Sequence, residues 1–574
     1  MAGVETSTTS PDVGRRWLRP TVVLPAVVGA GFAVLGAVWL ARLWVPNGDW
    51  AVAELVVRHT SRVIPLSGPY SAARGYNHPL PLVYALQWLP YRMFAQRSSA
   101  GLATTLWWNG TWLAVLLWMT ARIRAPWLGL AAFAGVVVMS AKTPSGSLLM
   151  PWNPTLAVVP AVVLVFVAWR VALGSRRSVP VMAGLGVWCV GAHLGFAPFV
   201  APLGLISLVS LVIVTARRPD TDSDRRGADR ARRWNWSAVS GLWRPLLAGV
   251  GVALVLVSPM IVDVAANRGE SNPANIVRNG RLEDGTVRVS NGELVKVFTA
   301  ELALPPAWAT VDPPYTYVMR VSPLRFPWVA LIGVAAAGLA WRRRAFDELA
   351  GMGLALTALG GAVAGLANIG AGSILPWYLL PAHAASIALY AFVAWSTARS
   401  VLALVDSLLP RPTPAGAPSW LAPVTALVLV VLVAPTLRLD LLTIDTDVAV
   451  ADLLAGATEA VPTGAPVELV GPVNYDGFYT AALALALDRE GYDVRVPDDQ
   501  LYIFTDAMRA PREWTPTRLL VQFTKGGLVA PQPGARLLAQ SPIGDMIFVE
   551  ADRISLWEAP PAAATESASP EPTP

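Results

Sequence analysis

Two carboxylates, Asp49 and Glu54, lie in the segment NGDWAVAEL at positions 47–55, directly after a long apolar run. A carboxylate at a membrane boundary can act as a general base when it reaches an acceptor hydroxyl within hydrogen-bond distance. The apolar flank at 50–53 favours partial burial, which raises the pKa of a carboxyl group. The alternative is that Asp49 caps a helix beginning at Trp50. The local pattern leaves both interpretations open.

The residues that follow add cations and an aromatic stretch. Arg58, His59 and Arg74 come first, and Asn77 and His78 open the stretch YNHPLPLVYALQWLPYRMF. Residues 79–94 are apolar, short and rich in aromatics, which is typical of an amphipathic helix at a membrane interface. A spanning helix is the competing interpretation, but it would invert the orientation of the basic loops that follow.

The composition predicts a multi-pass membrane protein. Of the 574 residues, 54% are hydrophobic and 14% are charged, whereas a soluble domain carries about 25% charged residues. Apolar runs long enough to cross a bilayer recur along the chain. The single cysteine, Cys189, excludes an intramolecular disulfide and a cysteine-based metal site. The predicted spans are 21–45, 100–121, 126–142, 155–174, 179–193, 196–216, 245–264, 326–341, 349–368, 375–396 and 418–437.

The arginines predict the orientation of these spans. They gather in alternate short loops, and residues 216–236 alone hold seven of them. Because cytoplasmic loops carry the excess of positive charge, the N-terminus is expected in the cytoplasm and the C-terminus outside the plasma membrane. The net charge of +6 is therefore an orientation signal rather than a sign of nucleic-acid binding. The segments expected outside are 46–99, 143–154, 265–325 and the C-terminal region.

The chain is expected to divide into four parts. Residues 1–20 form a cytoplasmic tail, and 21–438 form an α-helical transmembrane domain. The strand-like segments 467–471, 492–496, 518–524 and 546–552, with a helix over 476–491, predict a small extracytoplasmic α/β domain at 439–558. The Pro/Ala/Ser-rich end, 559–574, is typical of a disordered tail.

The order of these motifs resembles that of a known superfamily. A first span, then GDWAVAEL, then YNHPLPLVYALQWLPYRMF, then a span ending in arginines is similar to the GT-C superfamily of polyprenyl-phosphate-sugar-dependent glycosyltransferases. The likeness is greatest to the branch that holds aminoarabinose transferases, protein mannosyltransferases and actinobacterial arabinofuranosyl- and mannosyltransferases. SILPWYLLPAHAASIALY, at 373–390, is also similar to a segment of this superfamily. Here Trp377 stands where arginine is common.

The resemblance implies roles for the candidate residues. Asp49 matches the general base of the superfamily, and Glu54 is a reasonable second carboxylate; the single displacement would be inverting. Asn77 and His78 match the later first-loop motif, and Tyr378 lies in the segment that opens a late span. A leaving lipid phosphate needs cations or hydrogen-bond donors. The candidates placed outside are Arg58, His59, Arg74, His78, Lys142, Arg320 and Arg325.

Trp152 and Asn153, in MPWNP at 150–154, offer an aromatic face and an amide to a sugar. Their alternative roles are an interfacial tryptophan and a helix cap, and Lys142 is as well explained by snorkelling to the headgroups. His193 and His383 are expected to be hydrogen-bonded residues at helix ends. The scattered histidines give no metal signature; the chain requires no cofactor, although a divalent cation is compatible with the acidic pair.

The implied partners are a polyprenyl-phosphate sugar, the bilayer and a glycan, lipid or protein acceptor. The excess of Arg over Lys is typical of a GC-rich genome, such as that of an actinobacterium, for which arabinose or mannose would be the natural sugar. Two other functions stay open: a lipid or glycan transporter or flippase, and a non-catalytic assembly protein of the cell envelope. A transporter is expected to place charges in mid-span, and the predicted spans carry almost none.

Overall fold

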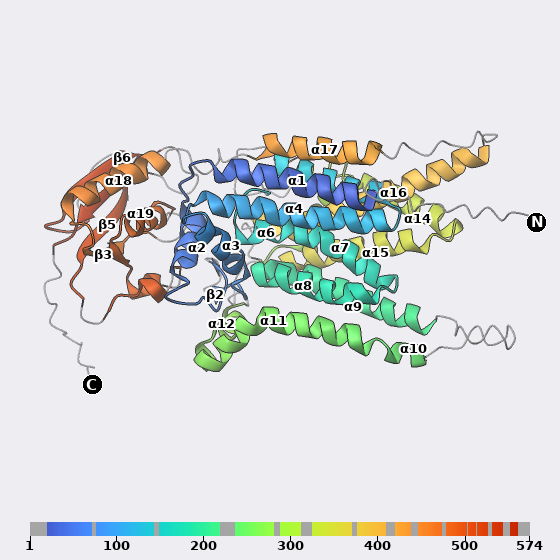
Figure 1. The fold of residues 1–574 in the computed structure, drawn as a ribbon, viewed down its shortest axis with the longest axis horizontal. Helices are drawn as coiled ribbons and strands as arrows, with labels where there is room; N and C mark the ends of the chain where they lie inside the picture. Colours follow the sequence, from blue (N-terminus) through green and yellow to red (C-terminus); the bar gives the residue numbers. More distant parts are fainter. Residues whose placement is uncertain are drawn as a thin grey trace, which may run out of the picture.

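The protein is a helical bundle with a small mixed domain at one end (Figure 1). The structure is a computed structural model. It describes residues 20–71, 76–142, 148–217, 236–280, 288–310, 324–369, 376–408, 420–437, 446–472, 478–501, 503–504, 506–511, 514–525, 531–543 and 551–560.

Each predicted span contains a helix. These helices are α1 (Pro20–Leu40), α4 (Ser99–Arg122), α5 (Pro126–Lys142), α7 (Val158–Ala172), α8 (Val179–Ala192), α9 (Ala197–Ala216), α11 (Trp243–Asn267), α14 (Trp328–Arg342), α15 (Phe346–Gly365), α16 (Leu380–Leu408) and α17 (Leu421–Val433). Six helical segments among the described residues are long and apolar enough to cross a membrane, and three more are apolar but shorter. The protein is therefore membrane-embedded, while the number of eleven spans stays a prediction.

The helices differ in how much of their surface the protein itself covers. In the segment Asn153–Ala172, which includes α7, 94% of the most apolar window is buried, whereas in Trp236–Glu270, which includes α11, only 6% is. Helix α7 is thus the centre of the bundle, in contact with α4, α8, α9, α15 and α16. Helix α11 lies at the periphery (Figure 1) and exposes large aliphatic side chains, as a lipid-facing helix does.

Two connecting regions lie at the end of the bundle that carries the small domain (Figure 1). The first contains α2 (Gly48–His59), the short strands β1 (Tyr70–Ser71) and β2 (Tyr76–Asn77), and α3 (Leu82–Met93); the second contains α12 (Asn272–Asn279) and α13 (Asn291–Glu301). The 12 residues of α3 cover about 18 Å at 1.5 Å per residue. Because a bilayer core is about 30 Å thick, α3 is too short to span it.

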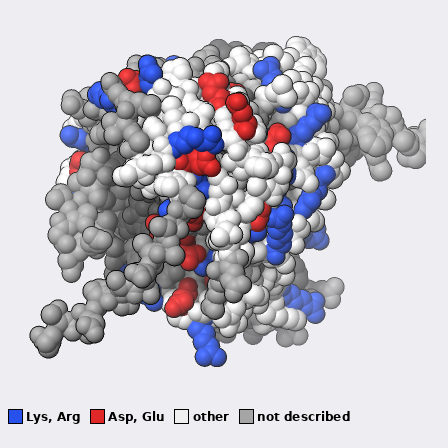
Figure 2. Space-filling view, turned by 90° about the vertical axis from the view of Figure 1, so that its left-hand side faces the viewer, with Lys and Arg blue, Asp and Glu red and all other residues white. Residues whose placement is uncertain are grey.

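The C-terminal domain is built on a five-stranded sheet of order β4-β3-β5-β7-β6. Strand β3 (Pro466–Val470) pairs in parallel with β4 (Asp493–Arg495) and β5 (Thr517–Thr524), while β7 (Arg553–Glu558) pairs antiparallel with β5 and β6 (Arg536–Pro542). Helices α18 (Thr446–Ala460) and α19 (Phe478–Arg489) pack with it. Acidic and basic side chains are interspersed over the described surface of this end (Figure 2).

Much of this domain follows the sequence prediction. Strands β3, β4 and β5 and helix α19 coincide with the predicted elements, but α18, β6 and β7 were not predicted. The strand predicted at 546–552 lies mostly outside the described residues. The helix predicted for the first span ends at Leu40 rather than at 45.

Glycines allow α1 and α4 to pack closely. A Cβ on Gly110 of α4 would lie 2.3 Å from the Cβ of Phe32, and one on Gly36 of α1 would lie 2.2 Å from the indole of Trp107. Phe32 is almost fully buried. A methyl group at 110 therefore forces the two helices apart.

We expect Gly110→Ala to lower the stability of the folded protein by about 1–3 kcal/mol through overpacking. The measurement is thermal unfolding in detergent. The matched control is Gly338→Ala in α14, where a new Cβ meets nothing within 4 Å; this change should be neutral or stabilising, because alanine favours a helix over glycine. Equal effects of the two substitutions would contradict the packing argument.

Candidate functional site

Asp49 lies in the first turn of α2, and the chain enters this helix through Gly48. Gly48 has φ 46°, in the left-handed region that glycine adopts most readily. The N-cap is Asn47, whose carbonyl accepts hydrogen bonds from the amides of Trp50 and Ala51 at 3.0 and 3.2 Å. The alternative in which Asp49 caps the helix is therefore wrong. Its carboxylate instead accepts a hydrogen bond from Nε1 of Trp152 at 3.0 Å.

The surroundings of Asp49 suit a carboxylate that reacts. Its side chain keeps a solvent-accessible surface, yet enough protein surrounds the carboxyl group that burial raises its pKa above the usual range; the hydrogen bond from Trp152 partly opposes this rise. The phenol of Tyr84 in α3 is close enough to feel the charge of Asp49. The pKa of Tyr84 is raised, mainly by burial and to a smaller extent by the charge of Asp49. Asp49 is thus a partly desolvated carboxylate that an acceptor can reach.

A continuous line of rings, here called the aromatic row, leads away from Asp49. Trp50 of α2 lies against Trp152, which precedes α6 (Asn153–Leu156), with ring centroids 6.5 Å apart. Trp152 contacts Trp377 at 5.3 Å, and Trp377 contacts Tyr378 at 6.0 Å. The ring of His193, at the end of α8, lies 6.4 Å from that of Tyr378. The row thus brings together a first-loop residue of α2 and residues that directly precede α6, follow α8 and precede α16.

The aromatic row ends in a pair of imidazoles. The rings of His78 and His193 are 4.5 Å apart, and both side chains are buried. Successive backbone amides bind them: Leu194 donates to Nδ1 of His78 at 3.3 Å, and Gly195 donates to Nδ1 of His193 at 3.2 Å. Burial and the neighbouring His193 lower the pKa of His78 well below its usual value. A neutral imidazole whose Nδ1 accepts carries its hydrogen on Nε2.

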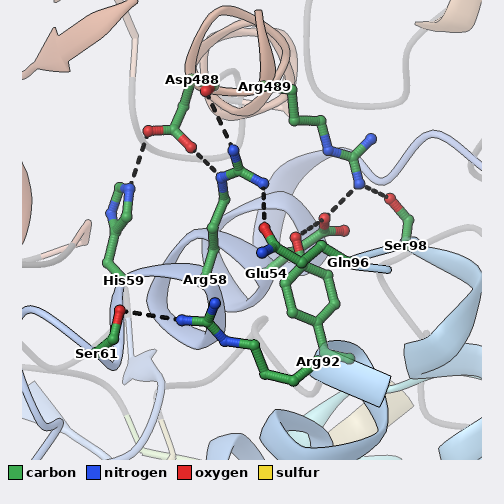
Figure 3. A network of polar contacts seen from close by, with 10 residues as sticks. Glu54, Arg58, His59, Ser61, Arg92, Gln96, Ser98, Asp488 and Arg489 are labelled. Atoms are coloured by element: carbon green, nitrogen blue, oxygen red, sulfur yellow. Dashed lines mark hydrogen bonds and ion pairs between the residues drawn. The ribbon is translucent and has the colours of Figure 1, made fainter. Parts of the chain in front are cut away.

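Three predicted site residues bind the C-terminal domain instead (Figure 3). Arg58 forms an ion pair from Nε to the carboxylate of Asp488 in α19, and His59 Nε2 lies 2.9 Å from the other carboxylate oxygen. Glu54 pairs with Arg489 and accepts from the hydroxyl of Tyr91 at 2.9 Å. Burial acts to raise the pKa of Asp488, but His59 and Arg58 lower it below the usual range.

The other predicted residues have varied surroundings. Asn77 donates through its side chain to Ser67 at 2.8 Å, and its backbone amide donates to Asn272 at 2.9 Å. Asn153 is buried and donates to the carbonyl of Ala192 at 3.2 Å. Lys142 is half-buried at the last residue of α5.

The remaining cations are divided between described and undescribed parts of the chain. Arg325 donates to the hydroxyl of Thr310 at 3.1 Å. Arg74 and Arg320 lie outside the described residues. In the described part of the chain, no group of three or more His, Cys, Asp and Glu side chains is arranged to hold a metal ion.

Sequence reasoning missed three members of the site. Tyr84 was not distinguished from the other aromatic residues of 79–94, which were expected to lie at the membrane interface. Trp377 was noticed only as a departure from a common arginine, and His193 was assigned to a helix end. The usable signal for Trp377 was its neighbour Tyr378 at the start of a predicted span, and the signal for His193 was a histidine at the last position of a predicted span.

The fold and the site define a membrane-embedded helical protein with a carboxylate and an aromatic row at one end of its bundle. No family model and no curated relative matches the chain. Among solved structures it is similar to apo ArnT from Cupriavidus metallidurans, with 16% identity and a TM-score of 0.49 over 92% of this chain and 97% of that one. ArnT bound to undecaprenyl phosphate matches with 15% identity and a TM-score of 0.47, over 93% and 97%.

A third structure extends the comparison. The arabinofuranosyltransferase AftD from Mycobacteria matches with 16% identity and a TM-score of 0.42, over 95% of this chain and 40% of that one. ArnT and AftD are members of the GT-C superfamily. The chain is thus similar, at low identity, to solved structures of members of that superfamily.

The hydrogen bond from Trp152 gives a direct test of the electrostatics of Asp49. Trp152→Phe removes the donor that lowers the pKa of this carboxyl group, so we expect Asp49 to titrate at higher pH than in the wild type. The carboxyl band in infrared difference spectra, assigned with Asp49→Asn, reports the titration. Trp377→Phe removes an indole of the same row that is not bonded to Asp49 and should leave the titration in place; a shift in both variants would exclude a specific effect of the hydrogen bond.

Proposed function

We propose that the protein is a membrane glycosyltransferase that moves a sugar from a polyprenyl-phosphate donor to an extracytoplasmic glycan, lipid or protein acceptor. The observation that carries this proposal is the position of Asp49: an accessible carboxylate of raised pKa, hydrogen-bonded to Trp152 at the start of the aromatic row. The donor class, and arabinose or mannose as the sugar, follow from the resemblance of the first-loop motifs.

In the proposed reaction, Asp49 accepts the proton of the acceptor hydroxyl as its oxygen attacks the anomeric carbon. The new glycosidic C–O bond forms while the bond from the anomeric carbon to the phosphate oxygen breaks. The electron pair of the broken bond stays on the lipid phosphate, which leaves. Since one displacement occurs, the anomeric centre inverts. A general base of this kind contributes about 10²–10⁴-fold to a rate.

The aromatic row fits the remaining parts of the donor. The faces of Trp152 and Trp377 suit stacking with a sugar ring. At the other end of the row, His78 and His193 present Nε2–H groups that no described residue accepts, and two neutral donors can stabilise the leaving phosphate. Of the other cations proposed from the sequence, Lys142 and Arg325 lie in the described part of the chain, and Arg74 and Arg320 lie outside it.

We also propose that the end of the bundle with α2, α3 and the C-terminal domain faces outward. The arginines that follow α4 and α14, and those between α7 and α8, come at the opposite ends of these helices. That end is then cytoplasmic, because positive charge is enriched there. Asp49 would lie where a lipid-linked sugar meets an acceptor outside the cell.

Asp49→Asn tests the general base. The amide keeps an oxygen for Trp152 but cannot take up the proton, so we expect sugar transfer to fall by at least about 10²-fold. The measurement is transfer from a synthetic polyprenyl-phosphate sugar in detergent or liposomes. Asp499→Asn, in an exposed turn of the C-terminal domain, is the matched control and should retain activity. Wild-type transfer by the Asp49 variant would refute the assignment.

His193→Phe tests the donor role of the imidazole pair. It keeps an aromatic ring but removes the Nε2–H, and the loss of a hydrogen bond to a charged group should weaken binding of the lipid phosphate product about tenfold. The measurement is inhibition of transfer by added polyprenyl phosphate. The control is Trp188→Phe in α8, which removes an indole that donates a hydrogen bond to the carbonyl of Leu156 in α6. Unchanged inhibition in the His193 variant would show that His193 does not donate a hydrogen bond to the lipid phosphate.

A further inference from the structure

The last turn of α19 and the second half of α2 are joined by charged groups from both helices (Figure 3). We call this contact the α2–α19 joint, and it consists of Glu54, Arg58 and His59 of α2 with Asp488 and Arg489 of α19. The two ion pairs of the joint run in opposite senses: Arg58 binds Asp488, and Glu54 binds Arg489. Asp488 is also held by His59 at 2.9 Å.

Neighbouring residues accept hydrogen bonds from further donors of the two arginines. Arg58 donates from Nη1 to the side chain of Gln96 at 2.7 Å and from Nη2 to the backbone carbonyl of Asp488 at 3.3 Å. Arg489 donates to Ser98 as well as to Glu54. Each guanidinium is therefore already bound by at least two acceptors. These bonds hold the guanidinium groups against protein acceptors, so the two arginines are suited to fixing two protein segments.

The apolar sides of α2 are also divided between different parts of the protein. Ala51, Val52 and Leu55 belong to the hydrophobic core of the C-terminal domain. Trp50, one residue away from Ala51, belongs to the core of the bundle. Ala53, Val56 and Val57 pack with Tyr84 and Tyr91 of α3. Helix α2 is thus a shared element, since no single domain packs against all of its faces.

The geometry of α2 links the joint to the site. Nine residues separate Asp49 from Arg58, which corresponds to about 13.5 Å along a helix. An α-helix of this length moves as a stiff rod, so a change of its tilt at Arg58 displaces Asp49 and alters its hydrogen bond with Trp152. Displacement of a reacting group by about 1 Å can lower a rate by about 10²-fold.

We infer that the C-terminal domain positions the general base: through the α2–α19 joint it holds helix α2 at the tilt that places Asp49 against Trp152. This inference rests on the proposed function of Asp49. Under it, Glu54, Arg58, His59, Asp488 and Arg489 are positioning residues that do not touch the substrate. The domain is then part of the active-site architecture rather than a separate acceptor-binding module.

A purely structural anchor makes different predictions from a positioning joint. An anchor that only attaches the domain would affect stability and yield, but each folded molecule would react as the wild type does. A positioning joint changes the reaction of the folded protein. Loss of the joint should lower kcat more than it changes KM for the donor. It should also move the acid limb of the pH–rate profile, because the hydrogen bond from Trp152 to Asp49 is weakened.

The test uses the full-length protein in liposomes with a polyprenyl-phosphate sugar. Asp488→Asn keeps the shape of the side chain but removes the charge that Arg58 and His59 share, and Arg489→Gln breaks the second ion pair. We expect each to lower kcat about tenfold or more, with KM for the donor within about threefold of the wild type. The acid limb should shift to higher pH, because the hydrogen bond that lowers the pKa of Asp49 is weakened.

Two matched variants control for charge and for folding. Arg509→Gln removes an arginine of the same domain that pairs with the exposed Asp498 and Asp506, at 3.3 and 2.9 Å; it should leave kcat and the acid limb unchanged. Asp488→Glu keeps the charge and should restore most of the activity lost in Asp488→Asn. Rates are divided by the folded fraction, measured by thermal unfolding. If Asp488→Asn does not fold, the milder Arg58→Lys takes its place with the same expectations.

The outcomes separate this inference from the proposed function. If Asp49→Asn is inactive while folded Asp488→Asn and Arg489→Gln show the kcat and acid limb of the wild type, the positioning inference is overturned and the general base stands. A rise in KM alone would also overturn it, since that result indicates substrate binding by the joint. If Asp49→Asn transfers sugar normally, the proposed function itself fails.

Discussion

Helix α2 packs against two hydrophobic cores at once, and this double packing sets the position of Asp49. Trp50 enters the core of the bundle, while its neighbours Ala51 and Val52 enter the core of the C-terminal domain. Successive residues of a helix point about 100° apart, so the helix can do this only at one rotation about its axis. At that rotation Asp49 meets the indole of Trp152. The site is therefore a consequence of how bundle and domain meet.

Polar groups at this end of the bundle are divided into two kinds of environment. The α2–α19 joint uses charges that neutralise one another, such as Arg58 with Asp488. The aromatic row instead offers the buried imidazoles of His78 and His193, and burial, together with the neighbouring His193, lowers the pKa of His78. A neutral site binds a lipid phosphate only through directed hydrogen bonds, and this favours recognition by geometry rather than by net charge. In the proposed reaction, Arg58 stays bound to Asp488 and does not compete for the phosphate.

Local sequence pattern predicted most of the elements but not the α2–α19 joint. The apolar runs predicted the helices of the bundle, and alternation of apolar residues predicted β3 to β5, since both signals lie within one segment. The role of Asp49 was suggested by its place after the first span. Arg58 and Asp488, however, lie 430 positions apart, and nothing near Arg58 distinguishes a protein partner from a phosphate. Strands β6 and β7 escaped prediction because their short stretches carry many polar residues.

The placement of the buried carboxylates inside the bundle bears on the choice between catalysis and transport. Glu348, in the first turn of α15, is paired with Arg343, which follows the last residue of α14, and with Arg399 of α16. Glu301, the last residue of α13, lies 2.7 Å from His383 at the start of α16. Both carboxylates thus lie at ends of the described helices. A substrate pathway through the bilayer requires polar groups in mid-span, whereas chemistry on a lipid headgroup requires them at the helix ends. Asp49 lies in the first turn of α2, at the end of the bundle that carries the C-terminal domain (Figure 1).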